Sequence, residues 1–134
     1  MALKKSVKEM VDEAEARIET LTVEEAIKLQ EDEDHVFVDI RDVRELDHEG
    51  MVPGAFHAPR GMLEFWVDPE SPYHKDIFSS GKTFVLYCRS GHRSALATAT
   101  LQDMGLAPVC HMGGGFTAWT EAGGPVAERP RKKD

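Results

Sequence analysis

The chain has 134 residues, of which 41% are hydrophobic and 30% are charged, and its formal net charge is −8. A chain of this length is expected to form one domain that buries an adequate core without staples. The acidic balance argues against nucleic acid as a partner, because general nucleic-acid binding needs a basic face. Two cysteines are too few for a disulfide framework, and no Cys/His spacing predicts a metal site.

Nothing in the sequence predicts a membrane partner or a secreted protein. No apolar run approaches the roughly 20 residues of a membrane span. The N-terminal segment mixes basic and acidic residues before an apolar core could form, so it does not resemble a secretory signal. We therefore expect a cytoplasmic protein, in a compartment where a working thiol stays reduced.

The first part of the chain predicts two helices and two strands. Apolar residues recur at helical spacing between residues 3 and 18, which predicts an amphipathic helix that packs on its own domain in preference to a dimer contact. Thr22 and Glu25 form a capping box for a second helix that runs to about Gln30. Short apolar runs predict a buried strand over residues 36–39 and a shorter one near 18–21.

The remaining elements continue the alternation of strands and helices. Further strands are expected near residues 55–58, 83–87 and 109–112, with helices near 42–47, 72–78, 95–104 and 116–121. Such alternation indicates an α/β fold, with a mostly parallel sheet of about five strands and helices on both faces. We divide the chain into an N-terminal helix (1–17), the main domain (18–128) and a charged tail (129–134).

The most informative stretch is residues 83–94, TFVLYCRSGHRS. A buried strand ends at Cys88, and a helix begins a few residues later. Ligands of open α/β sheets bind at the carboxyl ends of strands, and unpaired N–H groups at a helix start favour negative charge. With Arg89 and Arg93 close by, we expect the Cys88 thiol to lose its proton more readily than a free thiol and to rest as the thiolate.

The residues around Cys88 predict a cradle for an anion. Gly91 tolerates the positive φ that a loop needs to turn its N–H groups inward around one point. Ser90, His92 and Ser94 supply further donors. A nucleophile at the centre of such a cradle suits covalent catalysis on a small anionic substrate.

Residues 88–94 resemble the active-site loop of the rhodanese sulfurtransferases, and residues 36–41, 52–55 and 113–119 resemble three further segments of that family in the expected order. The resemblance covers roughly residues 18–126 and implies the three-layer rhodanese fold. It implies Cys88 as the catalytic residue and Asp39 as a structural support nearby. It also implies that residues 89–94 bind substrate, namely Arg89, Ser90, Gly91, His92, Arg93 and Ser94.

Two positions leave the assignment of the pocket open. Met51 stands where relatives commonly have a histidine, which weakens any polar contact there. Arg60 lies in a segment that forms part of the pocket rim in some relatives, so it is a third candidate cation for the substrate. An ordinary surface ion pair explains Arg60 equally well.

The activity implied by the resemblance is sulfur transfer. The Cys88 thiolate would take the sulfane sulfur of an anionic donor such as thiosulfate, and the persulfide would pass it to a thiol or cyanide acceptor in a ping-pong cycle. No metal or organic cofactor is needed, and a monomer and a homodimer both remain open. Two arginines in the loop favour thiosulfate over 3-mercaptopyruvate, while a persulfide from another protein stays open as donor.

Three alternatives compete with this hypothesis. Cysteine phosphatases and arsenate reductases also place a thiolate in an arginine-bearing loop, but they separate the two residues by five positions, whereas four separate Cys88 from Arg93. A rhodanese-like interaction module without turnover is the second, although silent members typically lack the cysteine. The third is an inert buried thiol, which is the role expected for Cys110.

Overall fold

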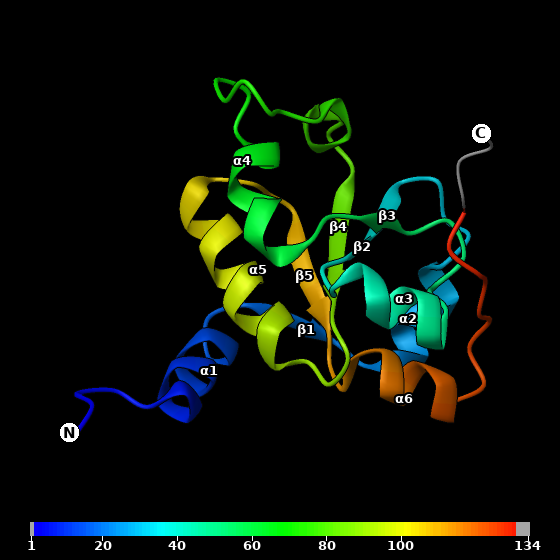
Figure 1. The fold of residues 1–134 in the computed structure, drawn as a ribbon, viewed down its shortest axis with the longest axis horizontal. Helices are drawn as coiled ribbons and strands as arrows, with labels where there is room; N and C mark the ends of the chain where they lie inside the picture. Colours follow the sequence, from blue (N-terminus) through cyan, green and yellow to red (C-terminus); the bar gives the residue numbers. More distant parts are fainter. Residues whose placement is uncertain (1, 131–134) are drawn as a thin grey trace.

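A computed structural model describes residues 2–130 of the chain, and its core is one five-stranded sheet (Figure 1). The strands lie in the order β1-β5-β4-β2-β3, and every pair of neighbours is parallel. Their bounds are β1 (Glu19–Leu21), β2 (His35–Asp39), β3 (Phe56–His57), β4 (Thr83–Tyr87) and β5 (Val109–Met112).

Helices cover both faces of the sheet, which confirms the predicted three-layer α/β fold (Figure 1). One face carries α4 (Leu63–Val67) and α5 (His92–Met104), and α1 (Val7–Glu15) packs on α5. The opposite face carries α2 (Val23–Leu29) and α6 (Gly115–Glu121). The remaining elements are α3 (Val43–Glu49) and two short 3-10 helices, Arg60–Met62 and Asp76–Ser79.

The two faces of the sheet are filled by alternate residues of the central strands. In β4, Phe84 and Leu86 face α4 and α5, whereas Val85 and Tyr87 face α2 and α6. Successive side chains of a strand point to opposite faces, so a strand buried on both sides must be apolar throughout. This requirement explains why short apolar runs in the sequence predict the strands.

Three helices differ from the predicted ones for local reasons. The first helix begins at Val7 instead of residue 3, because the Ser6 hydroxyl accepts from the Glu9 N–H and caps it. Helix α5 begins at His92, three residues earlier than predicted, because Gly91 is its left-handed N-cap. The helix expected over residues 72–78 is replaced by the 3-10 turn Asp76–Ser79.

Both ends of the described chain are attached to the domain. On α1, Val11 and Ala14 pack against α5, and Arg17 forms a bidentate ion pair with Asp103 at 2.8 and 2.9 Å. Arg129, which we assigned to the charged tail, pairs with Asp47 at 2.8 Å. Residues 131–134 of that tail lie outside the described residues. Within residues 2–130, every helix is too short or too polar to cross a membrane.

The connections after β2 and β4 diverge at the carboxyl ends of these two neighbouring strands. From β2 the chain continues outward to β3, and from β4 it continues in the opposite direction to β5. In open α/β sheets, ligands bind where the connections diverge in this way. Asp39 ends β2 and Cys88 directly follows β4, so both lie at this point.

The glycine turn before α6 supports the loop that follows β4. The N–H of Phe116 donates to the Cys88 carbonyl oxygen at 2.8 Å, and the N–H of Thr117 donates to that of Arg89 at 3.0 Å. Gly115 has φ +62°, and a Cβ placed on it would lie 2.5 Å from the Cys88 carbonyl oxygen. The backbone of this turn therefore lies directly against the cysteine loop.

We predict that Gly115→Ala destabilises the fold more than Gly123→Ala. Both positions have positive φ, which costs a non-glycine residue about 1–3 kcal/mol, but a Cβ on Gly123 meets no atom within 4 Å. The excess cost at Gly115 measures the clash with the cysteine loop. Urea unfolding of both variants measures this excess as the difference between their free energies of unfolding. Equal losses of unfolding free energy in the two variants would contradict the supporting role of this turn.

Candidate active site

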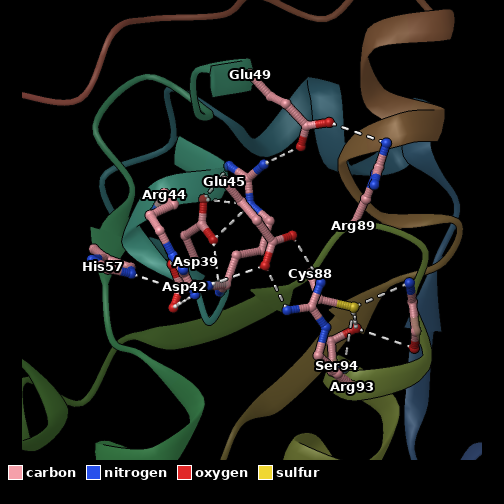
Figure 2. A network of polar contacts seen from close by, with 12 residues as sticks. Asp39, Asp42, Arg44, Glu45, Glu49, His57, Cys88, Arg89, Arg93 and Ser94 are labelled. Carbon is pink, nitrogen blue, oxygen red and sulfur yellow. Dashed lines mark hydrogen bonds and ion pairs between the residues drawn. The ribbon is translucent and has the colours of Figure 1, made fainter. Parts of the chain in front are cut away.

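The Cys88 sulfur is buried, with 1% of the residue exposed, and backbone N–H groups point at it (Figure 2). The N–H of Gly91 donates to Sγ at 3.2 Å and the N–H of Ser94 donates at 3.4 Å. The Ser94 hydroxyl oxygen lies 3.6 Å from the same sulfur. These donors form the core of the cradle that the sequence predicts.

The sulfur occupies the place of a capping side chain on α5. Gly91 is the N-cap of that helix and Ser94 is its third residue, so their N–H groups belong to the first turn, where no helical carbonyl is available. A side-chain oxygen usually accepts these bonds, and here Cys88 Sγ accepts them. Because the N-terminus of a helix carries partial positive charge, this position is one where an anionic group is bound favourably.

The backbone of Gly91 makes the arrangement possible. Its φ of +101° lies in the left-handed region, which turns its N–H back toward Cys88. A Cβ at this position would also approach the backbone nitrogen of Gly114 to 3.2 Å. Glycine is therefore required here by conformation and by the neighbouring turn.

Both loop arginines are paired with glutamates of α3, which the sequence analysis did not foresee (Figure 2). Arg93 forms a bidentate pair with Glu45 at 2.9 and 3.0 Å, and Arg89 lies 3.4 Å from Glu49. The hydrogen bonds from Arg93 hold the pKa of the Glu45 carboxyl below its usual range. The positive charge near Cys88 is therefore shared with two carboxylates.

A buried ion pair joins the end of β2 to the loop after α3. The Arg41 guanidinium donates to Asp39 at 2.7 Å and to the Gly50 carbonyl oxygen at 2.7 Å, and both charged side chains are fully buried. Arg41 also reaches Glu49 at 3.2 Å and lies 4.4 Å from the centre of the Phe116 ring. Asp39 thus lies within a network that fixes α3, consistent with the support role expected for it.

Several other predicted site residues lie at the protein surface. Arg89, Ser90 and His92 are exposed, and His92 lines a hollow with residues of α1. Arg60 pairs with Glu64 at 2.7 Å and lines a separate hollow between α1 and α5. The structure therefore brings Gly91 and Ser94 to the Cys88 sulfur and pairs Arg93 with Glu45, whereas the charged partner that it gives Arg60 is Glu64.

Sequence reasoning also missed a buried histidine behind the sulfur. His111 of β5 lies with Nδ1 2.9 Å from the Ser94 hydroxyl and with Nε2 3.0 Å from the Thr20 hydroxyl. Burial lowers the pKa of His111 to about 4, so its imidazole is neutral at physiological pH. The available signal was a polar residue in the middle of a strand that is otherwise apolar.

Cys110 is buried like Cys88, but its described contacts lack the N–H donors that surround Cys88. It is buried in the sheet, and its thiol lies 3.7 Å from the Phe84 carbonyl oxygen. Burial raises the pKa of the Cys110 thiol to about 12. It is the core residue that the sequence predicts. In the part of the chain that the structure describes, no group of three His, Cys, Asp or Glu side chains is placed to hold a metal ion.

Comparison with known proteins places the chain in one family. The family model of the rhodanese-like domain matches residues 22–122. A sulfurtransferase of Allochromatium vinosum is 35% identical over 99 residues, which cover 74% of this chain and 84% of that protein.

Solved structures share the fold over most of the chain. A polysulfide-sulfur transferase homodimer from Wolinella succinogenes matches with a TM-score of 0.68 and 33% identity, covering 91% of this chain and 87% of that one. A Rhodopseudomonas palustris protein of unknown function, described as a possible tyrosine phosphatase, matches with a TM-score of 0.92 and 54% identity, covering 95% and 98%. With the matched family model and the Allochromatium relative, these similarities show that the chain belongs to the rhodanese family.

Proposed function

We propose that this protein is a sulfurtransferase that carries a sulfane sulfur on Cys88. Membership of the rhodanese family and the sulfurtransferase relatives support a role of this type. The observation that carries the proposal is the pair of N–H groups, from Gly91 and Ser94, that point at the Cys88 sulfur. An inert core thiol such as Cys110 has no such donors among its described contacts.

The first half-reaction loads the cysteine. The Cys88 thiolate attacks the outer sulfur of thiosulfate or a similar donor, and a new S–S bond forms on Cys88. The S–S bond within thiosulfate breaks, and its electron pair leaves with sulfite. The product is a Cys88 persulfide whose terminal sulfur is negatively charged, and the first turn of α5 stabilises that charge.

The second half-reaction removes the sulfur from Cys88. A thiolate or cyanide acceptor attacks the terminal sulfur, the S–S bond of the persulfide breaks, and its electron pair returns to Cys88 as the thiolate. Because one covalent intermediate joins two separate steps, the kinetics are ping-pong. The cycle consumes no cofactor.

The glutamates of α3 modulate donor binding in this scheme. Arg93 is the loop cation that would bind an anionic donor at Cys88, and its guanidinium is already paired with Glu45. An anionic donor must therefore compete with the Glu45 carboxylate for Arg93. The two glutamates offset part of the positive charge that the loop arginines offer to thiosulfate. The preference for thiosulfate is therefore weaker than the loop sequence alone indicates, and polysulfide and persulfide remain candidate donors.

Phosphatase activity is the second candidate, because the Rhodopseudomonas relative is described in those terms. Four residues separate Cys88 from Arg93 in this chain, one fewer than in the cysteine phosphatases. A smaller ring of N–H groups suits a single sulfur atom better than a tetrahedral phosphate. Sulfur transfer is therefore the function that the loop supports better.

We predict that thiosulfate or polysulfide adds one sulfur atom to Cys88. Mass spectrometry of the intact protein and of its peptides measures the addition. Cys110→Ser should still be loaded, because that thiol lies in the core, whereas Cys88→Ser should not. A protein that hydrolyses p-nitrophenyl phosphate through Cys88 and accepts sulfur from none of these donors would replace this proposal with the phosphatase.

We predict that Glu45→Gln lowers the KM for thiosulfate by about two- to fivefold, the worth of a partly exposed ion pair. Glutamine keeps the capping box at the start of α3, where the Glu45 side chain accepts from the Asp42 N–H. Glu64→Gln is the matched control, since it releases Arg60 in the same way without touching the loop. A lower KM in Glu64→Gln would return Arg60 to the substrate site, and an unchanged KM in Glu45→Gln would remove Arg93 from it.

A further inference from the structure

A line of hydrogen-bonding side chains runs from the Cys88 sulfur to the edge of the sheet. The Ser94 hydroxyl lies 3.6 Å from Sγ and 2.9 Å from His111 Nδ1, and His111 Nε2 lies 3.0 Å from the Thr20 hydroxyl. The four residues come from the loop after β4, from α5, from β5 and from β1. The line crosses the sheet because Thr20 and His111 are register partners in neighbouring strands.

The line connects a buried sulfur to solvent. Cys88 is 1% exposed, Ser94 is fully buried and His111 is 2% exposed, whereas Thr20 lies exposed on the edge strand. A thiol buried to this degree has little direct contact with a water molecule that could accept its proton. The side chains between Cys88 and Thr20 are all able to donate and accept.

Each ring nitrogen of His111 faces a hydroxyl, so both tautomers of the neutral ring have partners. With the proton on Nε2, His111 donates to Thr20 and accepts from Ser94, and the Ser94 oxygen is left to accept from a Cys88 thiol. With the proton on Nδ1, His111 donates to Ser94 and accepts from Thr20. The Ser94 hydroxyl, which lies 3.3 Å from the Gly91 carbonyl oxygen, then turns from that carbonyl to donate to a Cys88 thiolate, and the Ala95 N–H continues to donate to the carbonyl. The tautomer of His111 and the charge on Cys88 are thereby linked.

His57 shows what a histidine with one fixed role looks like in the same fold. Its Nε2 lies 2.7 Å from the Arg41 carbonyl oxygen, which can only accept, so that nitrogen must carry the proton. The two hydroxyl partners of His111 place no such constraint on its ring, since a hydroxyl can donate or accept. This reversibility separates a relay from a satisfied core histidine.

We propose that Ser94, His111 and Thr20 form a proton relay between Cys88 and the surface, in which His111 is a positioning residue that sets the direction of the Ser94 hydroxyl. The proposal rests on the proposed function, in which the charged sulfur is the reactive form. It adds two residues, His111 and Thr20, that lie outside the loop.

The relay moves one proton without leaving an unpaired group. The Cys88 S–H bond breaks as its proton passes to Ser94 Oγ, and the former Ser94 proton passes to His111 Nδ1. The proton on Nε2 passes to Thr20 Oγ1, and the former Thr20 proton leaves to a water molecule. The products are a Cys88 thiolate, a hydronium ion and the same three side chains with every hydrogen bond reversed.

The direct test follows the tautomer of His111 by nitrogen-15 NMR while Cys88 ionises. The spectrum is recorded across the pH range in which the alkylation rate of Cys88 rises, with Cys88→Ser as the reference that cannot form a thiolate. We expect the proton to move from Nε2 to Nδ1 with the ionisation of Cys88 and to stay in place in the reference. A tautomer that is unchanged in both proteins would overturn the relay.

A matched pair of variants tests the link through Ser94. Ser94→Ala removes the hydroxyl between the sulfur and the ring, whereas Thr98→Val removes a buried hydroxyl one turn further along α5 that has no hydrogen-bond partner within the described chain. The coupling of tautomer to Cys88 ionisation should be lost in Ser94→Ala and kept in Thr98→Val. Coupling that survives in Ser94→Ala contradicts the proposal.

Variants of His111 test the relay independently if Ser94→Ala does not fold. His111→Leu should slow the alkylation of Cys88 at neutral pH by about fivefold, the worth of one hydrogen bond, and His111→Gln should recover part of the rate because its amide both donates and accepts. Equal rates in the wild type and both variants would remove His111 from the relay. Neither experiment uses a sulfur donor, so a protein that fails to transfer sulfur can still pass them.

Discussion

The structure depends on one interaction, in which the first turn of α5 donates its free N–H groups to a sulfur atom. In most helices a Ser, Thr, Asp or Asn oxygen accepts these bonds, and here Cys88 accepts them from Gly91 and Ser94. The position requires a strand that ends at the cysteine, a left-handed glycine three residues later, and a backbone turn at Gly115 pressed against the loop. A large part of the chemistry thus follows from how a strand is joined to a helix.

Charge around the sulfur is balanced more closely than the loop alone suggests. Glu45 and Glu49 project from α3 to the two loop arginines, and the buried Asp39–Arg41 pair holds the end of that helix in place. The acidic character of the chain therefore extends to the edge of the site. In the proposed function, an anionic donor is attracted only locally, by the helix N-terminus and by Arg93, within a protein whose net charge is −8.

Sequence reasoning succeeded where the determinants are local. Strands β4 and β5 were predicted to the residue, and the positive φ expected at Gly91 is observed, because buried strands are apolar and tight turns need glycine. It failed where a contact depends on how distant segments are placed together. Glu45 pairs with Arg93, which is 48 positions away in the sequence, and Thr20 contacts His111, which is 91 positions away. The local sequence around each residue does not predict its partner. The pairing of Arg60 with Glu64 was likewise not specified by the sequence, which left a substrate contact and a surface ion pair equally open.

In the proposed function, the N–H groups of the first turn of α5 make Cys88 the reactive cysteine, and Cys110 in the same molecule provides an internal reference. The most direct measurement is the rate at which iodoacetamide modifies each cysteine as a function of pH, read by mass spectrometry of the two peptides. We expect Cys88 to react faster than Cys110 and to go on reacting in mildly acidic solution. Equally slow modification of both cysteines would contradict the account.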